Sequence, residues 1–96
     1  MVSITTIEKK LAELKPVLFQ KYFVERIGYF GSFSRNEQRN NSDLDILVSF
    51  KKPIGWEFFD LQEFLEKELN IKVDLVSEKA IKEQLKDKIL NTVKYI

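Results

Sequence analysis

Stretches with the periodicity of a strand alternate with stretches with the periodicity of a helix along this 96-residue chain. In the helical stretches apolar residues recur every three or four positions, and between them lie short runs of β-branched and aromatic residues. This alternation favours an α/β (α+β) domain, in which helices cover a small mixed β-sheet of three to four strands. Because we find no repeat, linker or low-complexity tract, we expect residues 1–96 to form a single domain.

The first helical stripe consists of Ile7, Leu11, Leu14 and Leu18. Thr5 and Thr6 are candidates for its N-terminal cap. Pro16 removes a hydrogen-bond donor from this stripe and disfavours a helical Lys15. We therefore expect a kink, or a break into two short helices, between residues 5 and 23.

The remaining elements follow from the same patterns. Three runs predict strands, over residues 24–30, 43–50 and 71–76. A second stripe predicts a helix over 56–69. Ser77 is a candidate N-cap for a further helix through about Leu85. Other expected features are a turn over residues 36–41 and, over 93–96, either a last helical turn or a short edge strand.

Two residue types are missing from the sequence, which contains no histidine and no cysteine. Without cysteine there is no disulfide and no thiolate nucleophile, and without either type there is no zinc site of the usual nitrogen and sulfur kind. A Ser-His-Asp triad is excluded as well. An enzyme of this composition has to use carboxylates, hydroxyls, backbone amides and metal ions held by oxygen.

The charges nearly balance, since 16 Lys and Arg against 15 Asp and Glu give a net charge of +1. A dedicated nucleic-acid binder carries a clear basic excess, so nucleic acid is not the partner we expect. No apolar stretch reaches the roughly 18 residues of a membrane span, and the first residues lack the pattern of a signal peptide. We expect a cytoplasmic protein without membrane contact.

Residues 31–48, GSFSRNEQRNNSDLDILV, hold the densest group of residues suited to chemistry. Gly31 and Ser32 end a predicted strand and precede residues 33–35, which could begin a helix. Free N–H groups at such a start, beside a hydroxyl and a glycine, suit a phosphate group. Helix capping alone also explains a Gly-Ser pair, so both interpretations stand at this point.

Asp43 and Asp45 lie two positions apart on a predicted strand and therefore project from the same face. Two carboxylates held so close are stable in the ionised form only with a cation between them, and Mg²⁺ suits oxygen ligands on a rigid strand. The alternative is a solvent-facing strand start with a turn at residues 42–43.

Asp74 lies inside the next apolar strand, where an acidic residue is costly without a partner. If the two strands are neighbours, Asp74 lies beside Asp45 on their shared face. Three carboxylates near a phosphate site are what metal-assisted phosphoryl or nucleotidyl transfer needs. A salt bridge with Lys72 or an arginine is the alternative for Asp74.

These residues resemble the signature of the minimal nucleotidyltransferases of the DNA polymerase β superfamily, a Gly-Ser pair followed after ten residues by Asp-x-Asp. The matching residues are Gly31, Ser32, Asp43, Asp45 and, on a later strand, Asp74. With the order of helices and strands, the resemblance covers essentially the whole chain and implies a polymerase-β-like nucleotidyltransferase core. Ser34 and Asn36 depart from the pattern, since the family usually has Ala and Gly there.

The resemblance implies a role for each acidic residue. Asp43 and Asp45 would hold two Mg²⁺ ions. Asp74 would complete the site of the ion that activates the acceptor hydroxyl, as a ligand and as a candidate base.

The resemblance also implies a nucleotide site. Ser32 and the backbone amides next to Gly31 would bind the β- and γ-phosphates of a nucleoside triphosphate, with ATP as the nucleotidyl donor. Arg35 could add positive charge near the leaving pyrophosphate, although an exposed Arg on a helix surface is an equally good interpretation.

Chains that resemble this one commonly occur as the antitoxin of a toxin–antitoxin pair and transfer AMP from ATP to a tyrosine of a partner HEPN-type ribonuclease. The short chain agrees with this expectation, because larger relatives carry extra domains for their acceptor. Two rivals stay open: a non-catalytic module that neutralises its partner by occlusion, and nucleotidyl transfer to a small molecule or RNA. The acceptor, the base preference and the oligomeric state, a homo-oligomer included, are not determined by the sequence, nor is the effect of Ser34 and Asn36.

Overall fold

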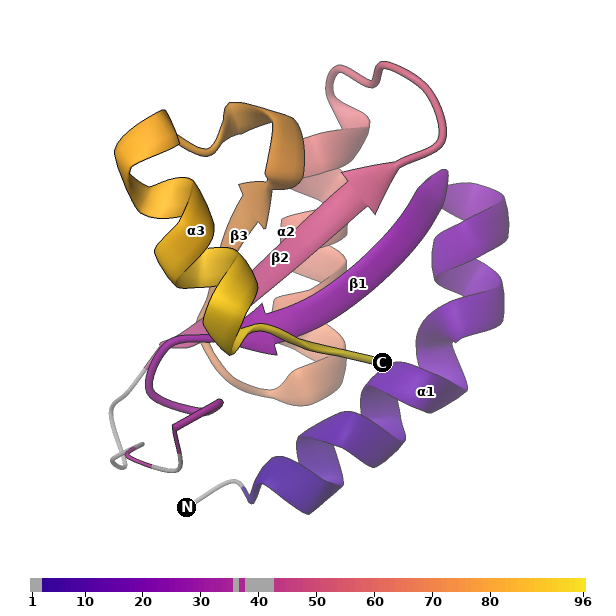
Figure 1. Cartoon of the computed structure of the whole chain (residues 1–96). Helices are drawn as coiled ribbons and strands as arrows, with labels where there is room; N and C mark the ends of the chain where they lie inside the picture. The colour runs from indigo at the N-terminus through magenta and orange to yellow at the C-terminus, as the bar shows by residue number, and fades with distance from the viewer. Residues whose placement is uncertain (1–2, 36, 38–42) are drawn as a thin grey trace.

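The computed structural model describes residues 3–35, 37 and 43–96 (Figure 1). Its elements in chain order are α1 (Ile4–Lys21), β1 (Val24–Phe30), β2 (Leu44–Phe50), α2 (Glu57–Leu69), β3 (Val73–Ser77), the 3₁₀ turn η1 (Glu78–Ala80), α3 (Glu83–Thr92) and β4 (Lys94–Tyr95). The predicted strands are confirmed to within about two residues at each end, the uncertainty normal for such boundaries.

The strands form one mixed sheet in the order β3-β2-β1-β4. β1 runs antiparallel to both β2 and β4, whereas β2 and β3 are parallel. A parallel pair needs a long crossover connection, which α2 supplies. Figure 1 shows α2 behind the sheet, α3 in front of it and α1 alongside β1. The expected α/β class with a small mixed sheet is therefore confirmed.

The core lies between the sheet and the pair α1 and α2. The alternating residues Leu44, Ile46 and Val48 of β2 are fully buried there. They pack in one cluster with the buried stripe of α1 and with Leu61 and Leu65 of α2. Because side chains alternate along a strand, Asp45 is turned to the opposite face, on the side of α3.

The expected break at Pro16 is wrong, since α1 continues as one helix through this residue. Pro16 lies on the exposed side, while Leu14 and Leu18 on the buried stripe are only 9% and 0% exposed. Packing of that stripe offsets the missing hydrogen bond. The N-cap is Ser3, two to three residues earlier than the expected Thr5 or Thr6, and the Thr6 N–H donates to the Ser3 hydroxyl over 3.1 Å.

The segment after β3 also differs from the expectation. Ser77 makes no side-chain cap bond, and only the short η1 follows it before α3 begins at Glu83. Glu78 accepts hydrogen bonds from Arg26 at 2.9 Å and Tyr95 at 2.7 Å. These long-range contacts hold η1 against the sheet, and no local sequence pattern predicts them. The edge-strand alternative for the tail is confirmed, because β4 pairs with β1.

The predicted turn over residues 36–41 lies outside the described residues, except for Glu37. The same is true of Asn36, one of the two departures from the family pattern. In the part of the chain that the structure describes, no helix is both long and apolar enough to span a membrane.

Candidate active site

Asp45 and Asp74 face each other directly across the parallel pair of β2 and β3. Both side chains project from the sheet face that carries α3, because Leu44, Val73 and Leu75 beside them point into the core. Asp45 is half-buried and Asp74 is exposed. The condition set by the sequence, that the two strands be neighbours, is therefore met, and the two acids share one face.

Asp45 is the acid whose charge the fold disfavours. Burial, then the negative charges of Asp74 and Asp43, raise its pKa from 3.8 to about 6. Arg35 acts in the opposite direction but does not offset them. Among the described residues, Arg35 compensates these neighbouring carboxylates only in part, and a bound cation would supply the remaining positive charge.

Asp43 is exposed and lies just before β2. Its negative charge contributes to the raised pKa of Asp45, and it is the residue directly before Leu44, where β2 begins, within the boundary uncertainty of the predicted strand. No group of three acidic side chains within residues 3–35, 37 and 43–96 is already closed around a cation position. Of the three predicted acids, Asp45 and Asp74 are held in register by the paired strands, whereas Asp43 lies in the exposed chain just before β2.

The chemistry of these donors fits a hard divalent cation. All three are carboxylates, and two of them lie on adjacent strands in direct register. Burial, then the negative charges of Asp74 and Asp43, raise the pKa of Asp45. Oxygen ligands of this kind suit Mg²⁺.

Gly31 lies directly against this acid pair. Its φ of +73° is one that side chains rarely adopt, and a Cβ built on it would meet the carboxylate of Asp45. Phe30, the residue before it, is the register partner of Asp45 across β1 and β2. A glycine is therefore required here both for the turn and for the space that the Asp45 side chain takes.

Residues 31–35 form a turn, and no helix begins at residue 33 as the sequence suggested. The buried Phe33 anchors the turn, and the Arg35 N–H donates to the Gly31 carbonyl over 3.2 Å. Within the described residues, the backbone N–H groups of Ser32, Phe33 and Ser34 have no acceptor. Three free donors in a row suit an anion such as phosphate.

The side chains of Ser34 and Arg35, also in this turn, both make polar contacts with described residues. The Ser34 hydroxyl donates to the Gly31 carbonyl over 2.9 Å, so the serine at this position adds a hydrogen bond to the turn. The Arg35 guanidinium pairs with Glu37 at 3.0 Å, and both side chains are exposed. A pair this exposed is weak, so Arg35 is available to an anionic ligand that approaches the turn.

A cleft of about 230 Å³ separates the turn from α3. Gly31 and Arg35 form one side of it and Lys88 lies on the other. No residue of α3 was among the functional residues predicted from the sequence. The signal that could have been used is the i, i+3, i+4, i+7 spacing of Leu85, Lys88, Ile89 and Thr92, which places a cation on the helix's apolar stripe.

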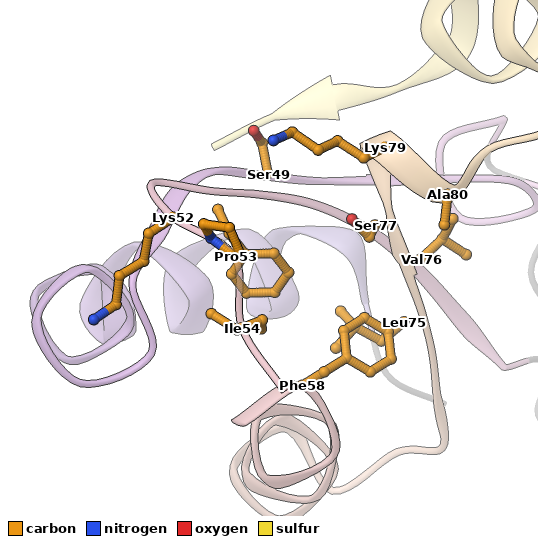
Figure 2. A pocket seen from close by; sticks show the side chains of 11 residues that line it. Ser49, Lys52, Pro53, Ile54, Phe58, Leu75, Val76, Ser77, Lys79 and Ala80 are labelled. Atoms are coloured by element: carbon orange, nitrogen blue, oxygen red, sulfur yellow. The ribbon is translucent and has the colours of Figure 1, made fainter. Parts of the chain in front are cut away.

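A larger cavity of about 530 Å³ lies at the other end of β2 and β3. Figure 2 shows Ile54, Phe58 and Leu75 gathered around it. Among the described residues that line this cavity, none carries a carboxylate. Size alone would select this cavity, but the acids and the anion-binding turn are at the opposite end of the strands, so the chemistry is assigned there.

Comparison with known sequences gives matches along nearly the whole chain. Residues 4–96 match the family model described as nucleotidyltransferase domain. A candidate protein adenylyltransferase of Methanocaldococcus jannaschii is 47% identical over 83 residues, 85% of this chain and 85% of that protein. The protein adenylyltransferase MntA of Thermococcus cleftensis is 37% identical over 97 residues, covering 100% of this chain and 98% of that protein.

Comparison with solved structures agrees. A protein described as a minimal nucleotidyltransferase superposes with a TM-score of 0.82 at 30% identity, covering 97% of this chain and 95% of that one. A toxin–antitoxin complex with AMP-PNP contains a chain that superposes with a TM-score of 0.76 at 27% identity, covering 92% of this chain and 70% of that one. The fold that carries the paired aspartates is therefore shared with these proteins.

Proposed function

Because the chain belongs to the nucleotidyltransferase domain family and is a nucleotidyltransferase, we propose that it transfers AMP from ATP, with Mg²⁺, to a partner toxin and thereby acts as an antitoxin. The acceptor group is a tyrosine hydroxyl of a HEPN-type ribonuclease. The observation that carries this proposal is the register pair of Asp45 and Asp74 beside the glycine turn.

Two of the similar proteins support the donor and the acceptor class. The relative from Thermococcus cleftensis is named a protein adenylyltransferase, which supports transfer of AMP to a protein. The structurally similar toxin–antitoxin complex was solved with AMP-PNP, which supports an adenine nucleotide as donor and a toxin as partner. The HEPN class and the tyrosine are the finer expectations that the resemblance of the motif implies.

The acids would hold the metal at the end of the sheet. Asp45 and Asp74 offer two carboxylates from adjacent strands, and Asp43 offers a third from the chain just before β2. Mg²⁺ bound there would offset the negative charge of the triphosphate and favour ionisation of the acceptor hydroxyl. The same positive charge would compensate the repulsion that now raises the pKa of Asp45.

The 31–35 turn would bind the phosphates, and the exposed Asp74 would accept the proton of the acceptor hydroxyl. The free N–H groups of Ser32 and its neighbours, with the Ser32 hydroxyl, would hold the β- and γ-phosphates. The acceptor oxygen forms a bond to the α-phosphorus while the bond to the bridging oxygen of pyrophosphate breaks, and pyrophosphate leaves. Asp74, exposed on the acceptor side, would take the proton of the hydroxyl.

A protein acceptor agrees with the charge of the chain. The net charge of +1 offers little attraction to the phosphates of RNA. Because Asp74 is exposed, a second macromolecule can bring its hydroxyl to the acid pair without any rearrangement of the core.

The test is a labelling reaction with ATP carrying a labelled α-phosphate, Mg²⁺ and candidate acceptors: a HEPN toxin encoded beside this chain, RNA and aminoglycoside-like small molecules. We expect label on the toxin, a mass increase of one AMP located on tyrosine, and loss of both in Asp45→Asn. Label found only on RNA or on a small molecule would contradict transfer to protein.

The alternative in which the chain neutralises its partner by occlusion predicts a different result when the acids are substituted. If the chain neutralises the toxin by covering its active site, the double variant Asp43→Asn, Asp45→Asn still suppresses the ribonuclease at equal concentration, and no mass is added to the toxin. The adenylyltransferase proposal requires that this variant leave the ribonuclease active after the two proteins are separated.

A further inference from the structure

One stripe of α3 faces the 31–35 turn across the cleft. Leu85, Lys88, Ile89 and Thr92 line the cleft from α3, and Phe30, Gly31 and Arg35 line it from the end of β1 and the turn. In Figure 1 the C-terminal half of α3 lies in front of the tip of β1. The cleft therefore continues directly from the place where Gly31 contacts Asp45.

The packing of α3 does not account for the apolar residues on this stripe. No residue of α3 is buried, and Leu85 is 48% exposed. An amphipathic helix normally buries its apolar stripe against its own sheet. Here the stripe borders an open cleft, which leaves room for a ligand between the helix and the turn.

Lys88 is the cation of α3 that lines this cleft. The residues three and four positions away on the helix are Gln84, Leu85, Asn91 and Thr92, none of them acidic. Among the ion pairs of the described residues, none includes Lys88. Its ammonium group is thus not neutralised by a described neighbour.

The remaining polar groups of the cleft point to an anion. The Thr92 hydroxyl lies 3.1 Å from both the Lys88 and the Ile89 carbonyl, so it is used within its own helix. Lys88 and Arg35 are then the side chains left for a ligand. Arg35 belongs to the turn whose N–H groups at residues 32–34 have no acceptor among the described residues. Phe30 and Ile89 add apolar walls on either side of these two cations.

We propose that Lys88 binds the phosphate tail of the donor nucleotide across the cleft from the 31–35 turn and offsets the charge of pyrophosphate as it leaves. This role rests on the proposed function, because it takes a nucleoside triphosphate as the donor. A lysine suits a triphosphate as a mobile point charge.

The experiment measures nucleotide binding by the chain alone, in Mg²⁺, with ATP, AMP and inorganic tripolyphosphate as probes in competition with a fluorescent ATP analogue. The variants are Lys88→Ala and Lys88→Arg. Lys86→Ala is the matched control, an exposed lysine on the same helix that does not line the cleft and has Glu83 three positions before it. Circular dichroism confirms that each variant is folded.

We expect Lys88→Ala to weaken ATP and tripolyphosphate binding about ten- to a hundredfold and to change AMP binding by less than about twofold, as for loss of one contact to a charged group. Lys88→Arg recovers most of the affinity, and Lys86→Ala leaves it unchanged. Hydrogen exchange shows protection of α3 when ATP binds to the unsubstituted chain.

Three results would overturn the role of Lys88: unchanged ATP affinity in Lys88→Ala, an equal loss for ATP and AMP, or no ATP binding by the unsubstituted chain. The first two results leave the proposed function standing, because they concern Lys88 alone. Absence of ATP binding by the unsubstituted chain would overturn the proposed function as well. A chain that binds ATP through Lys88 but labels only RNA keeps this inference and loses the antitoxin proposal.

Discussion

A Cβ built on Gly31 would collide with the carboxylate of Asp45, with the Asp45 Cγ only 3.1 Å away. The acid of β2 therefore occupies the space that a side chain after β1 would need. Since Gly31 also has a φ of +73°, the position excludes other residues for two separate reasons. The phosphate-binding turn and the acid pair are thus built as one unit.

The first prediction concerns this contact. Gly31→Ala should lower the free energy of unfolding by about 1–3 kcal/mol, because it strains the backbone and displaces Asp45. It should also abolish AMP transfer. Urea denaturation and the labelling reaction measure the two effects. Gly55→Ala is the matched control, because a Cβ there meets nothing within 4 Å, and it should leave both unchanged.

The second prediction is a pH dependence of the metal-free protein. Because the pKa of Asp45 is raised to about 6 in the folded chain, its contribution to stability is full below pH 4, near its ordinary value of 3.8, and is lost as the pH rises through 6. Asp45→Asn should therefore stabilise the chain in EDTA at pH 7.5, by on the order of 1 kcal/mol once solvent around a half-exposed carboxyl is allowed for.

Thermal unfolding from pH 4 to pH 8 measures this effect. The gain in Tm of Asp45→Asn over the unsubstituted chain should shrink toward pH 4, where both side chains are neutral. Asp87→Asn on α3 is a control of the same chemistry in an exposed place. An Asp45→Asn variant less stable than the parent at pH 7.5 would contradict the prediction.

The third prediction concerns Mg²⁺. Binding to the native state alone raises stability by RT ln(1 + [L]/Kd), about 2.7 kcal/mol at a hundredfold excess over Kd. Mg²⁺ should therefore raise the Tm of the unsubstituted chain at pH 7.5, and this gain should be lost in Asp74→Asn, which removes one of the two paired carboxylates. Glu63→Gln, on the exposed face of α2, should retain it. Equal gains in both variants would exclude the paired aspartates as ligands.

The fourth prediction concerns the anchor of the C-terminal edge strand. Burial raises the pKa of Glu78, but the hydrogen bond from Tyr95 and the charge of Arg26 lower it overall. The stabilisation is therefore present at neutral pH and lost as the pH falls below the usual range of a glutamate. Tyr95→Phe should cost about 0.5–1 kcal/mol at pH 7, since it removes the 2.7 Å hydrogen bond to Glu78.

A double-mutant cycle with Glu78→Gln checks that contact. The coupling between the two substitutions should be measurable at pH 7 and smaller at pH 3. Additive effects at both pH values would show that Tyr95 contributes only its ring, which packs over the Arg26 guanidinium at 5.3 Å.

Much of the fold was predictable because the evidence for it is local. The alternation of Leu44, Ile46 and Val48 and the stripe from Ile7 to Leu18 identify a strand and a helix without knowledge of their partners. Pro16 shows the limit of such evidence. Its local effect is unfavourable to a helix, but packing of the buried stripe on both sides outweighs it.

Some features of the candidate site were also predictable from the sequence, and others were not. Gly31, Asp45 and Asp74 could be selected as candidate site residues from the sequence, because residue type and position along the chain are enough to recognise them. The motif did not show that Ser34 would bond to the Gly31 carbonyl, nor that Asp43 would stand just outside β2. Both depend on the exact course of the backbone after each strand.

The sequence by itself determined the strands β1, β2 and β3 and the helix α2, and the face of β2 that carries Asp45. It also determined the limitation to oxygen-based chemistry that follows from the absence of histidine and cysteine. Only the tertiary structure decided that β2 lies beside β3 and that Lys88 of α3 stands across a cleft from Gly31. The physical reason is the sequence separation of the residues that interact. Side-chain periodicity is set by neighbouring residues, whereas strand order and helix placement are set by packing and hydrogen bonds between segments far apart in the chain.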